Sequence, residues 1–374
     1  GPISESEYTA LHKKNKDYTQ NDTVGKAGLE QYYETYLRGK NGEQKFYIDN
    51  VGRISEIISS PDSVAGDDLY LSIDADLQKA TYLALQNEIA AIVYSNIKSG
   101  EIPINDVYTA LIGNSVINTE HFSKSKASDT EKSVLSVFKS RQKTTLGKIK
   151  QELTSSPEAL NTMSDEVLDE FTYIISMLKD DQVLLKNEID TSDSVYQKWK
   201  DQKISPKEYL NYCITQHWID ISQLNVDEKY ADSTEVYDAL CKYILKNIKT
   251  DTEFSKIIYQ YMITRGEISP RQLCLILFDQ GVLDYDDATV NKLKNGSLSP
   301  RDFLMKKIYN IEITPAQLAL EPCSGSCVVT DEKTGEIRAM VSYPGYDSNK
   351  LANGVDSEYF ASLQHDKSSP LLNY

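Results

Sequence analysis

Serine and lysine side chains recur in this sequence at a spacing that could support acyl-transfer chemistry. The Ser-x-x-Lys spacing occurs at Ser123 and Lys126, Ser136 and Lys139, Ser140 and Lys143, and Ser176 and Lys179, and a Lys-Thr-Gly run occurs at Lys333-Thr334-Gly335. On a helix this spacing places the lysine amine one turn from the serine hydroxyl, where it can take the proton and create a nucleophile. One hypothesis is therefore a self-contained serine acyl-transfer enzyme that uses one of these pairs with Lys333.

The surroundings of these residues argue against that hypothesis. The chain is rich in Ser and Lys, so four matches to so short a pattern are close to chance. No Ser-x-Asn companion is suitably placed to deliver protons, and Lys333-Thr334-Gly335 falls in the expected tight turn of a hairpin. We therefore expect no catalytic residue in this chain and keep the acyl-transfer enzyme as the alternative.

Other signals of catalytic or binding sites are also weak. Val24-Gly25-Lys26-Ala27 resembles a phosphate-binding loop, but the first glycine and the hydroxyl after the lysine are missing. The four histidines are isolated, and neither H-E-x-x-H nor paired C-x-x-C occurs. The acidic pair Asp180-Asp181 is typical of a solvated face in an acidic protein. We expect no cofactor and no metal.

The composition restricts the class of partner. The 374 residues carry 40 Lys and Arg against 56 Asp and Glu, a formal net charge of -16, which repels phosphate backbones and makes nucleic acid a poor partner. Hydrophobic residues make up 40% of the chain, enough to fill a core. The longest apolar runs, about 89–94 and 273–278, fall far short of the roughly 20 residues of a membrane helix. The chain starts Gly1-Pro2-Ile3 without a signal peptide, so we expect it to be a piece of a longer protein.

The five cysteines form an odd set: Cys213, Cys241, Cys274, Cys323 and Cys327. Three of them lie on apolar helix faces, where a free cysteine packs as a small hydrophobic residue. A bridge between Cys323 and Cys327 stays open, although the spacing favours unpaired thiols.

The first hundred residues mix helices and strands. Apolar residues at helical spacing predict a helix over about 28–38, with Gly39 as its C-terminal cap. Strands over 45–49 and 53–58 flank Asn50-Val51-Gly52 and predict a hairpin, and Leu69, Leu71 and Ile73 alternate like a third strand. Asp74 can cap a long helix that runs to about residue 96.

Residues from about 98 to 310 show helical patterning throughout. Four helix starts share one design, in which a hydroxyl residue precedes a proline and an acid or amide follows two residues later: Ser205-Pro206, Ser269-Pro270, Ser299-Pro300 and Thr314-Pro315. The starts show no fixed period, so the pattern predicts an irregular helical subdomain and not a solenoid. After Pro322, strands over 327–330 and 337–342 predict a second hairpin, and the tail from Tyr343 is turn-rich.

Two separated stretches resemble the class B penicillin-binding proteins, the serine D,D-transpeptidases that cross-link peptidoglycan. The first runs from Val24-Gly25-Lys26-Ala27-Gly28-Leu29-Glu30 through Leu37-Arg38-Gly39 and Asp49-Asn50 to Leu71-Ser72-Ile73-Asp74-Ala75-Asp76-Leu77-Gln78, and is similar to the pedestal, or dimerization, domain. The second, Gly325-Ser326 through Thr334-Gly335-Glu336-Ile337 to Tyr343-Pro344, is similar to the hairpin that begins the transpeptidase domain. The resemblance covers only these two ends, so the middle of the chain is interpreted as a helical insertion of the kind that clostridial-type members contain, and its role is not given by the match.

The resemblance implies a fold and a domain order. The fold class is α+β and predominantly helical: a mixed pedestal over 1–97, a large all-α insertion over 98–312, and over 313–374 a C-terminal β-hairpin that begins a transpeptidase domain. In the family the catalytic Ser-x-x-Lys follows the point where this chain ends. The chain is therefore expected to be a truncated, non-catalytic pedestal or scaffold piece.

The resemblance also implies partners and a location. Expected partners are cell-wall synthesis proteins or a second copy held through the pedestal, with β-lactam bound only by the full-length parent. The helical insertion could instead be a binding module for peptidoglycan or a protein partner. The expected location is the extracytoplasmic face of the bacterial membrane, with the anchor upstream of residue 1 and no span within the chain.

Overall fold

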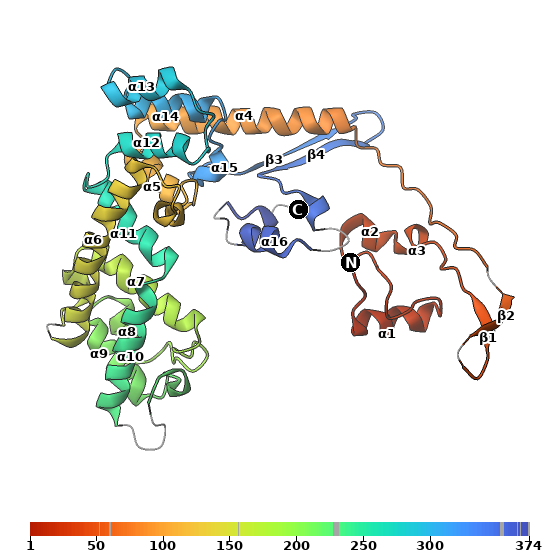
Figure 1. The fold of residues 1–374 in the computed structure, drawn as a ribbon, viewed down its shortest axis with the longest axis horizontal. Helices are drawn as coiled ribbons and strands as arrows, with labels where there is room; N and C mark the ends of the chain where they lie inside the picture. Colours follow the sequence, from red (N-terminus) through yellow and green to blue (C-terminus); the bar gives the residue numbers. More distant parts are fainter. Residues whose placement is uncertain are drawn as a thin grey trace. The chain divides into compact units, whose positions relative to one another are not determined.

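A computed structural model describes residues 1–51, 53–59, 61–155, 157–226, 232–351, 355–364, 366 and 368–372 (Figure 1). The chain divides into two compact units. Unit 1 combines Gly1–Gln86 with Ser324–Tyr374, and unit 2 is Asn87–Cys323. The fold is mostly helical with two small antiparallel sheets, which confirms the predicted class.

Unit 1 begins with three short helices. They are α1 (Glu5–Lys14), α2 (Gly28–Tyr32) and α3 (Glu34–Leu37). The continuous helix predicted over 28–38 is wrong, because the backbone leaves the helical region at Tyr33 with φ -99° and ψ 16°. The turn has a tertiary cause: the carboxylate of the next residue, Glu34, accepts hydrogen bonds from the Gly25 amide and the Tyr18 hydroxyl. Gly39 has φ +70° and so takes the predicted left-handed position beyond the last turn.

The predicted hairpin is confirmed as β1 (Lys45–Ile48) paired with β2 (Ile54–Ser59). Gly52, in its expected turn, lies outside the described residues. The third strand predicted from Leu69, Leu71 and Ile73 is wrong, because residues 65–73 form no strand. The end of this segment bonds β4 (Ile337–Tyr343) instead, through the Ser72 hydroxyl to the Ile337 carbonyl at 2.8 Å.

The long helix α4 (Ala75–Ser99) starts as predicted, with the Asp74 carboxylate accepting the Leu77 amide at 2.9 Å. Its first turn is bonded to β4: the Gln78 side chain donates to the Met340 carbonyl at 2.6 Å and accepts the Met340 amide at 2.7 Å. The buried side chains of α4 all lie in its second half, from Ile89 onward. Leu77 remains 37% exposed.

The second predicted hairpin is also confirmed, as β3 (Gly325–Thr330) paired with β4. In its turn the Asp331 carboxylate accepts the backbone amides of Lys333 and Thr334 at 2.9 and 3.0 Å. Gly335 has φ +74°, the conformation that the sequence predicted for this position. The tail, which looked turn-rich, contains the helix α16 (Ser357–Gln364).

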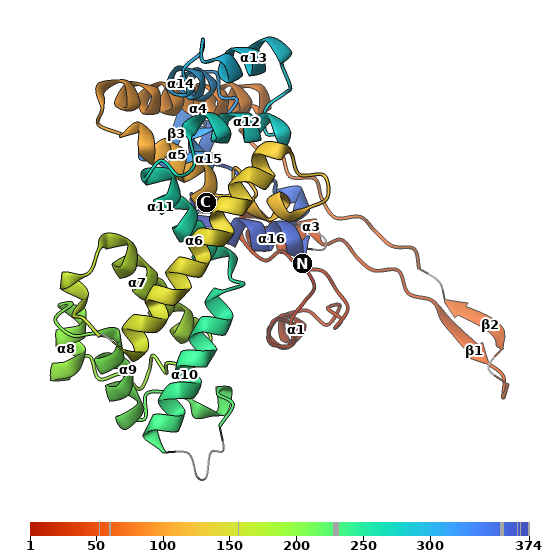
Figure 2. The ribbon, with the colours of Figure 1, turned by 60° about the vertical axis from the view of Figure 1, so that its left-hand side comes forward.

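Unit 2 is an irregular helical bundle, as predicted. Its elements after the second half of α4 are α5 (Ile104–Gly113), α6 (Asp129–Thr154), α7 (Asp165–Asp180), α8 (Ser194–Lys200), α9 (Pro206–Thr215), α10 (Ser233–Ile248), α11 (Thr252–Thr264), α12 (Pro270–Asp279), α13 (Asp287–Asn295), α14 (Pro300–Tyr309) and α15 (Pro315–Leu318). Both ribbon views show the long α6 running from the α12–α14 end of unit 2 to the α8–α10 end (Figures 1 and 2).

The four hydroxyl-proline helix starts are confirmed. They open α9, α12, α14 and α15, and in each the hydroxyl accepts the backbone amide three residues later. In α12 and α15 the glutamine side chain also reaches back to the cap residue. Each cap satisfies amides that the first turn would otherwise leave unpaired, and is worth about 1 kcal/mol.

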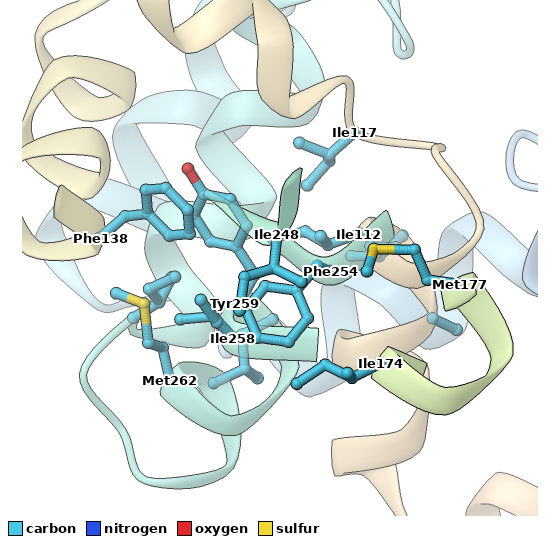
Figure 3. Close-up of a cluster of buried hydrophobic side chains, with 14 of the residues drawn as sticks. Ile112, Ile117, Phe138, Ile174, Met177, Ile248, Phe254, Ile258, Tyr259 and Met262 are labelled. Carbon is cyan, nitrogen blue, oxygen red and sulfur yellow. The ribbon is translucent and has the colours of Figure 1, made fainter. Parts of the chain in front are cut away.

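The core of unit 2 is apolar and aromatic. The Phe138 and Tyr259 rings stack at 4.1 Å between α6 and α11, and Phe122 meets Tyr259 edge to face at 5.9 Å. Around them lie residues of α5, α7 and α11, including Ile112, Ile174 and Phe254 (Figure 3). Cys213, Cys241 and Cys274 are buried thiols in this bundle, as predicted, and Cys323 and Cys327 form no disulfide with each other.

Two buried glutamates of α7 differ in the hydrogen-bond partners of their carboxyl groups. Glu166 accepts hydrogen bonds from Arg141 at 3.0 Å and from Arg265 at 2.5 Å. One turn later, Glu170 is 1% exposed and its Oε1 has no hydrogen-bond partner. Burial, with the nearby Glu166 charge, raises the pKa of Glu170 to about 8, against opposing effects of Lys148 and Arg141.

This carboxyl makes the stability of unit 2 dependent on pH. The unfolded pKa is near the usual 4.5 and the folded pKa is about 8, so the folded state holds the proton over that window. Stability therefore falls as pH rises through the window. We expect Glu170→Gln to gain stability over the wild type as pH rises from about 5 to about 9, by on the order of 3 kcal/mol. Urea unfolding at each pH measures it.

Glu166→Gln is the matched control, since it lies on the same helix but removes a paired carboxylate. It should lower stability at neutral pH, because two arginines lose their anionic partner and one of its two acceptor oxygens is replaced by an NH2 donor. Equal pH profiles for wild type and Glu170→Gln would contradict the prediction.

Candidate interaction surfaces

The N-terminal motif residues form a structural network around one cation. The Arg38 guanidinium lies 3.6 Å from the centroid of the Tyr18 ring, bonds the Asp17 carbonyl at 2.6 Å and pairs with Asp22. The Arg38 and Asp22 side chains are each only 10% exposed. Burial opposes ionisation of Asp22, but hydrogen bonds from Thr19 and the Arg38 charge outweigh it and lower the pKa of this carboxyl.

Glycines of the same region allow close backbone contacts. A Cβ at Gly25 would lie 2.2 Å from the Glu30 carbonyl carbon, and one at Gly66 would lie 2.0 Å from the Leu37 oxygen. Gly39 is restricted in the same way by the Val64 oxygen, 2.3 Å from its ideal Cβ. The motif glycines Gly25 and Gly39 therefore serve packing, and Val24-Gly25-Lys26-Ala27 shows no phosphate-loop geometry, since Gly25 donates to Glu34.

The β1–β2 hairpin presents an apolar face to solvent. Phe46 pairs with Ile57 and Ile48 with Ile54 across the strands, and these four side chains are 42%, 55%, 62% and 56% exposed. We call these four residues the hairpin face. An isolated two-stranded hairpin is marginal in water, and an exposed apolar patch with open strand edges favours docking of another polypeptide. Sequence patterning predicted the hairpin but not this exposure.

The four Ser-x-x-Lys pairs do not form a catalytic arrangement in unit 2. Ser123 donates to the Glu120 carbonyl at 2.9 Å and Ser176 to Asp180 at 3.5 Å, while Ser136 and Ser140 lie on the exposed side of α6. Across the described part of the chain, none of these hydroxyls bonds a lysine Nζ. Lys333 belongs to unit 1 and is exposed in the β3–β4 turn.

The described residues hold no group of three or more His, Cys, Asp and Glu side chains that could bind a metal ion. No helix in the same residues combines the length and apolar character that crossing a membrane requires.

Comparison with known proteins places the N-terminal region in a family. Residues 1–71 match the family model of the penicillin-binding protein dimerisation domain. The chain is 32% identical over 102 residues to peptidoglycan D,D-transpeptidase MrdA of Salmonella typhimurium strain SL1344, covering 27% of this chain and 16% of that protein. It is 33% identical over 118 residues to peptidoglycan D,D-transpeptidase FtsI of Escherichia coli K12, covering 32% and 19%.

These matched segments span less than a fifth of the length of either relative. No solved structure matches the chain. The clostridial type of the family stays a prediction, since neither relative bears on it.

We expect Arg38→Ala to destabilise the N-terminal part of unit 1 by about 3 kcal/mol, because it leaves the buried Asp22 carboxylate without its cation. Hydrogen exchange at the Gly25 amide, which Glu34 protects, measures the loss. Lys26→Ala removes the more exposed pair with Glu7 and is the control, with little change expected. Equal protection in the two variants would show that Arg38 does not organise this region.

Proposed function

Because the chain belongs to the class B penicillin-binding proteins, we propose that it acts as the non-catalytic pedestal of a peptidoglycan transpeptidase. The observation that carries the proposal is the use of the motif residues within 1–71: Gly25, Glu34 and Arg38 are all engaged in structural contacts. In such a region the polar side chains bond one another and hold the backbone in place. A region held in this way is suited to position the domains attached to it.

The proposal assigns three parts to the chain. Residues 1–97 belong to the pedestal, 98–312 form a helical insertion, and 313–374 begin the transpeptidase domain. The hydrogen bonds of Gln78 and Ser72 with β4 support a structural tie between the end of the pedestal sequence and the β3–β4 hairpin. Both tied segments lie within unit 1.

Peptidoglycan cross-linking by the parent protein is likewise a proposal. It follows from the activity for which the relatives MrdA and FtsI are named, that of peptidoglycan D,D-transpeptidases. In such a protein the pedestal would lie on the extracytoplasmic face of the bacterial membrane, where peptidoglycan is built. Acylation by β-lactam would be a property of the parent and not of these 374 residues.

The hairpin face is the part of the pedestal we assign to self-association. Strand edges and apolar side chains of β1 and β2 can meet the same surface of a second copy, as a two-fold interface requires. The domain-family description, a dimerisation domain, agrees with this role. Cell-wall synthesis proteins are the other partners that the same surface could accept.

We expect the double variant Phe46→Ser with Ile57→Ser to lower self-association of the chain at least ten-fold, because it removes a cross-strand apolar pair from the hairpin face. Sedimentation velocity over a range of concentrations measures the association. The control is Ile92→Ser with Val137→Ser, two comparably exposed apolar residues on helices of unit 2. A wild-type chain that stays monomeric at every concentration would rule out the second copy as the partner.

Fluorescent penicillin tests the absence of catalysis. We expect no covalent labelling of the chain, because Ser123, Ser136, Ser140 and Ser176 lack an activating lysine contact. Denaturing gels with in-gel fluorescence measure labelling, and an intact family transpeptidase is the positive control. A labelled peptide that contains one of the four serines would favour the alternative, a self-contained acyl-transfer enzyme.

A further inference from the structure

A basic groove lies between α6 and α10 of unit 2. Its volume is about 510 Å³, and its lining consists of Lys139, Gln142, Lys143, Leu146, Gly147, Lys150, Leu245 and Lys249. The two leucines are partly buried and form an apolar floor, while the four lysines are exposed. The lining contains no carboxylate.

The groove has fixed walls. At one end the Gln142 side chain of α6 donates to the Lys249 carbonyl at 3.0 Å, and at the other end the Tyr237 hydroxyl of α10 donates to the Leu153 carbonyl at 2.7 Å. Residue 142 of α6 thus faces the C-cap of α10 at 249, and residue 153 of α6 faces 237 on α10, so the two helices run antiparallel. Helix α6 itself sets the spacing of Lys139, Lys143 and Lys150, and Lys249 lies at the C-terminal end of α10.

The groove is a basic region of an acidic chain, because its lining has four lysines and no carboxylate. None of the four ammonium groups makes an ion pair with a described carboxylate within 4 Å, which is also true of most other described lysines; Lys203 and Lys256, which pair with Asp201 and Glu253, are among the few that do. The chain as a whole has a formal charge of -16. Four like charges on one groove repel one another, so an anionic ligand would relieve the repulsion.

Lysine stems also cover apolar surface, and this could explain part of the arrangement. Leu146 and Leu245 are suitably placed to be covered in that way. Covering the floor does not require charge, however, since glutamine has a similar apolar stem. Clustered charge without carboxylates therefore needs a separate reason.

We propose that this groove binds a linear polyanion with regularly spaced phosphate or carboxylate groups. Lys139 and Lys150 are eleven residues apart on α6, roughly 16 Å at 1.5 Å per residue, too far for one anion and suited to several repeats of a chain. A concave groove between two helices fits a polymer strand better than a flat lipid surface. This role goes beyond the pedestal function and does not depend on it.

The test uses the full 374-residue chain with long-chain inorganic polyphosphate as the phosphate probe and polyglutamate as the carboxylate probe. Fluorescence anisotropy measures binding, and neutral dextran is the uncharged comparison. We expect saturable binding of at least one polyanion, with a salt slope of about -3 if each of four contacts contributes roughly 0.7. The probe that binds more tightly identifies which anion the ligand carries.

The test variant replaces Lys139, Lys143, Lys150 and Lys249 by Gln. The control variant replaces Lys186, Lys198, Lys292 and Lys294 by Gln, which changes the net charge equally at exposed positions outside the groove. We expect the test variant to bind at least ten-fold more weakly with a salt slope near zero, and the control to bind like the wild type. Replacing the four groove lysines by Arg should preserve binding and shows that charge, not folding, is measured.

Three results would overturn the proposal. They are the absence of saturable binding of either polyanion to the wild type, an equal loss of affinity in the test and control variants, and binding to anionic lipid vesicles without binding to the soluble polymers. None of them bears on the hairpin face or on the absence of penicillin labelling, so the proposed function is tested independently.

Discussion

The N-terminal part of the pedestal depends on one buried cation. Arg38 holds together Tyr18, Asp17 and Asp22, residues that are distant from it in sequence. Small regions that bury little apolar surface need an additional interaction to link their segments. Here the Arg38 guanidinium links them through stacking and hydrogen bonds. Removing the Arg38 guanidinium should therefore destabilise the N-terminal part of unit 1 more than the rest of the unit.

Structural features that depend on residues adjacent in sequence could be predicted from the sequence. Features that depend on contacts between residues distant in sequence could not. Each hydroxyl-proline cap involves only four consecutive residues, so the residue types of that short segment predicted it correctly. These caps are at Ser205, Ser269, Ser299 and Thr314. The break at Tyr33 was missed because it depends on Glu34 reaching Gly25 and Tyr18. The alternation of Leu69 to Ile73 was misread as a strand because no neighbouring strand pairs with it among the described residues.

The candidate surfaces show the same division. The hairpin could be predicted from its alternation and turn, yet only the structure shows that Phe46 and Ile57 are exposed to solvent. Lys139, Lys143 and Lys150 are visible on one side of a predicted helix, but the sequence does not say that α10 lies beside them and closes a groove. Both proposed binding surfaces are made by two elements, and a sequence pattern within one element does not reveal which other element lies beside it.

The hydrogen bonds between residues 72–78 and β4 affect which edge of the small β3–β4 sheet a further strand could join. The Met340 amide and carbonyl both bond Gln78, and the carbonyls of Ile337 and Arg338 accept bonds from Ser72 and Asp74. From Ile337 to Met340, residues 72–78 therefore bond this side of β4 as a neighbouring strand would. A further strand could pair with that stretch of β4 only by displacing these bonds, so the end of the pedestal sequence favours growth of the sheet along β3.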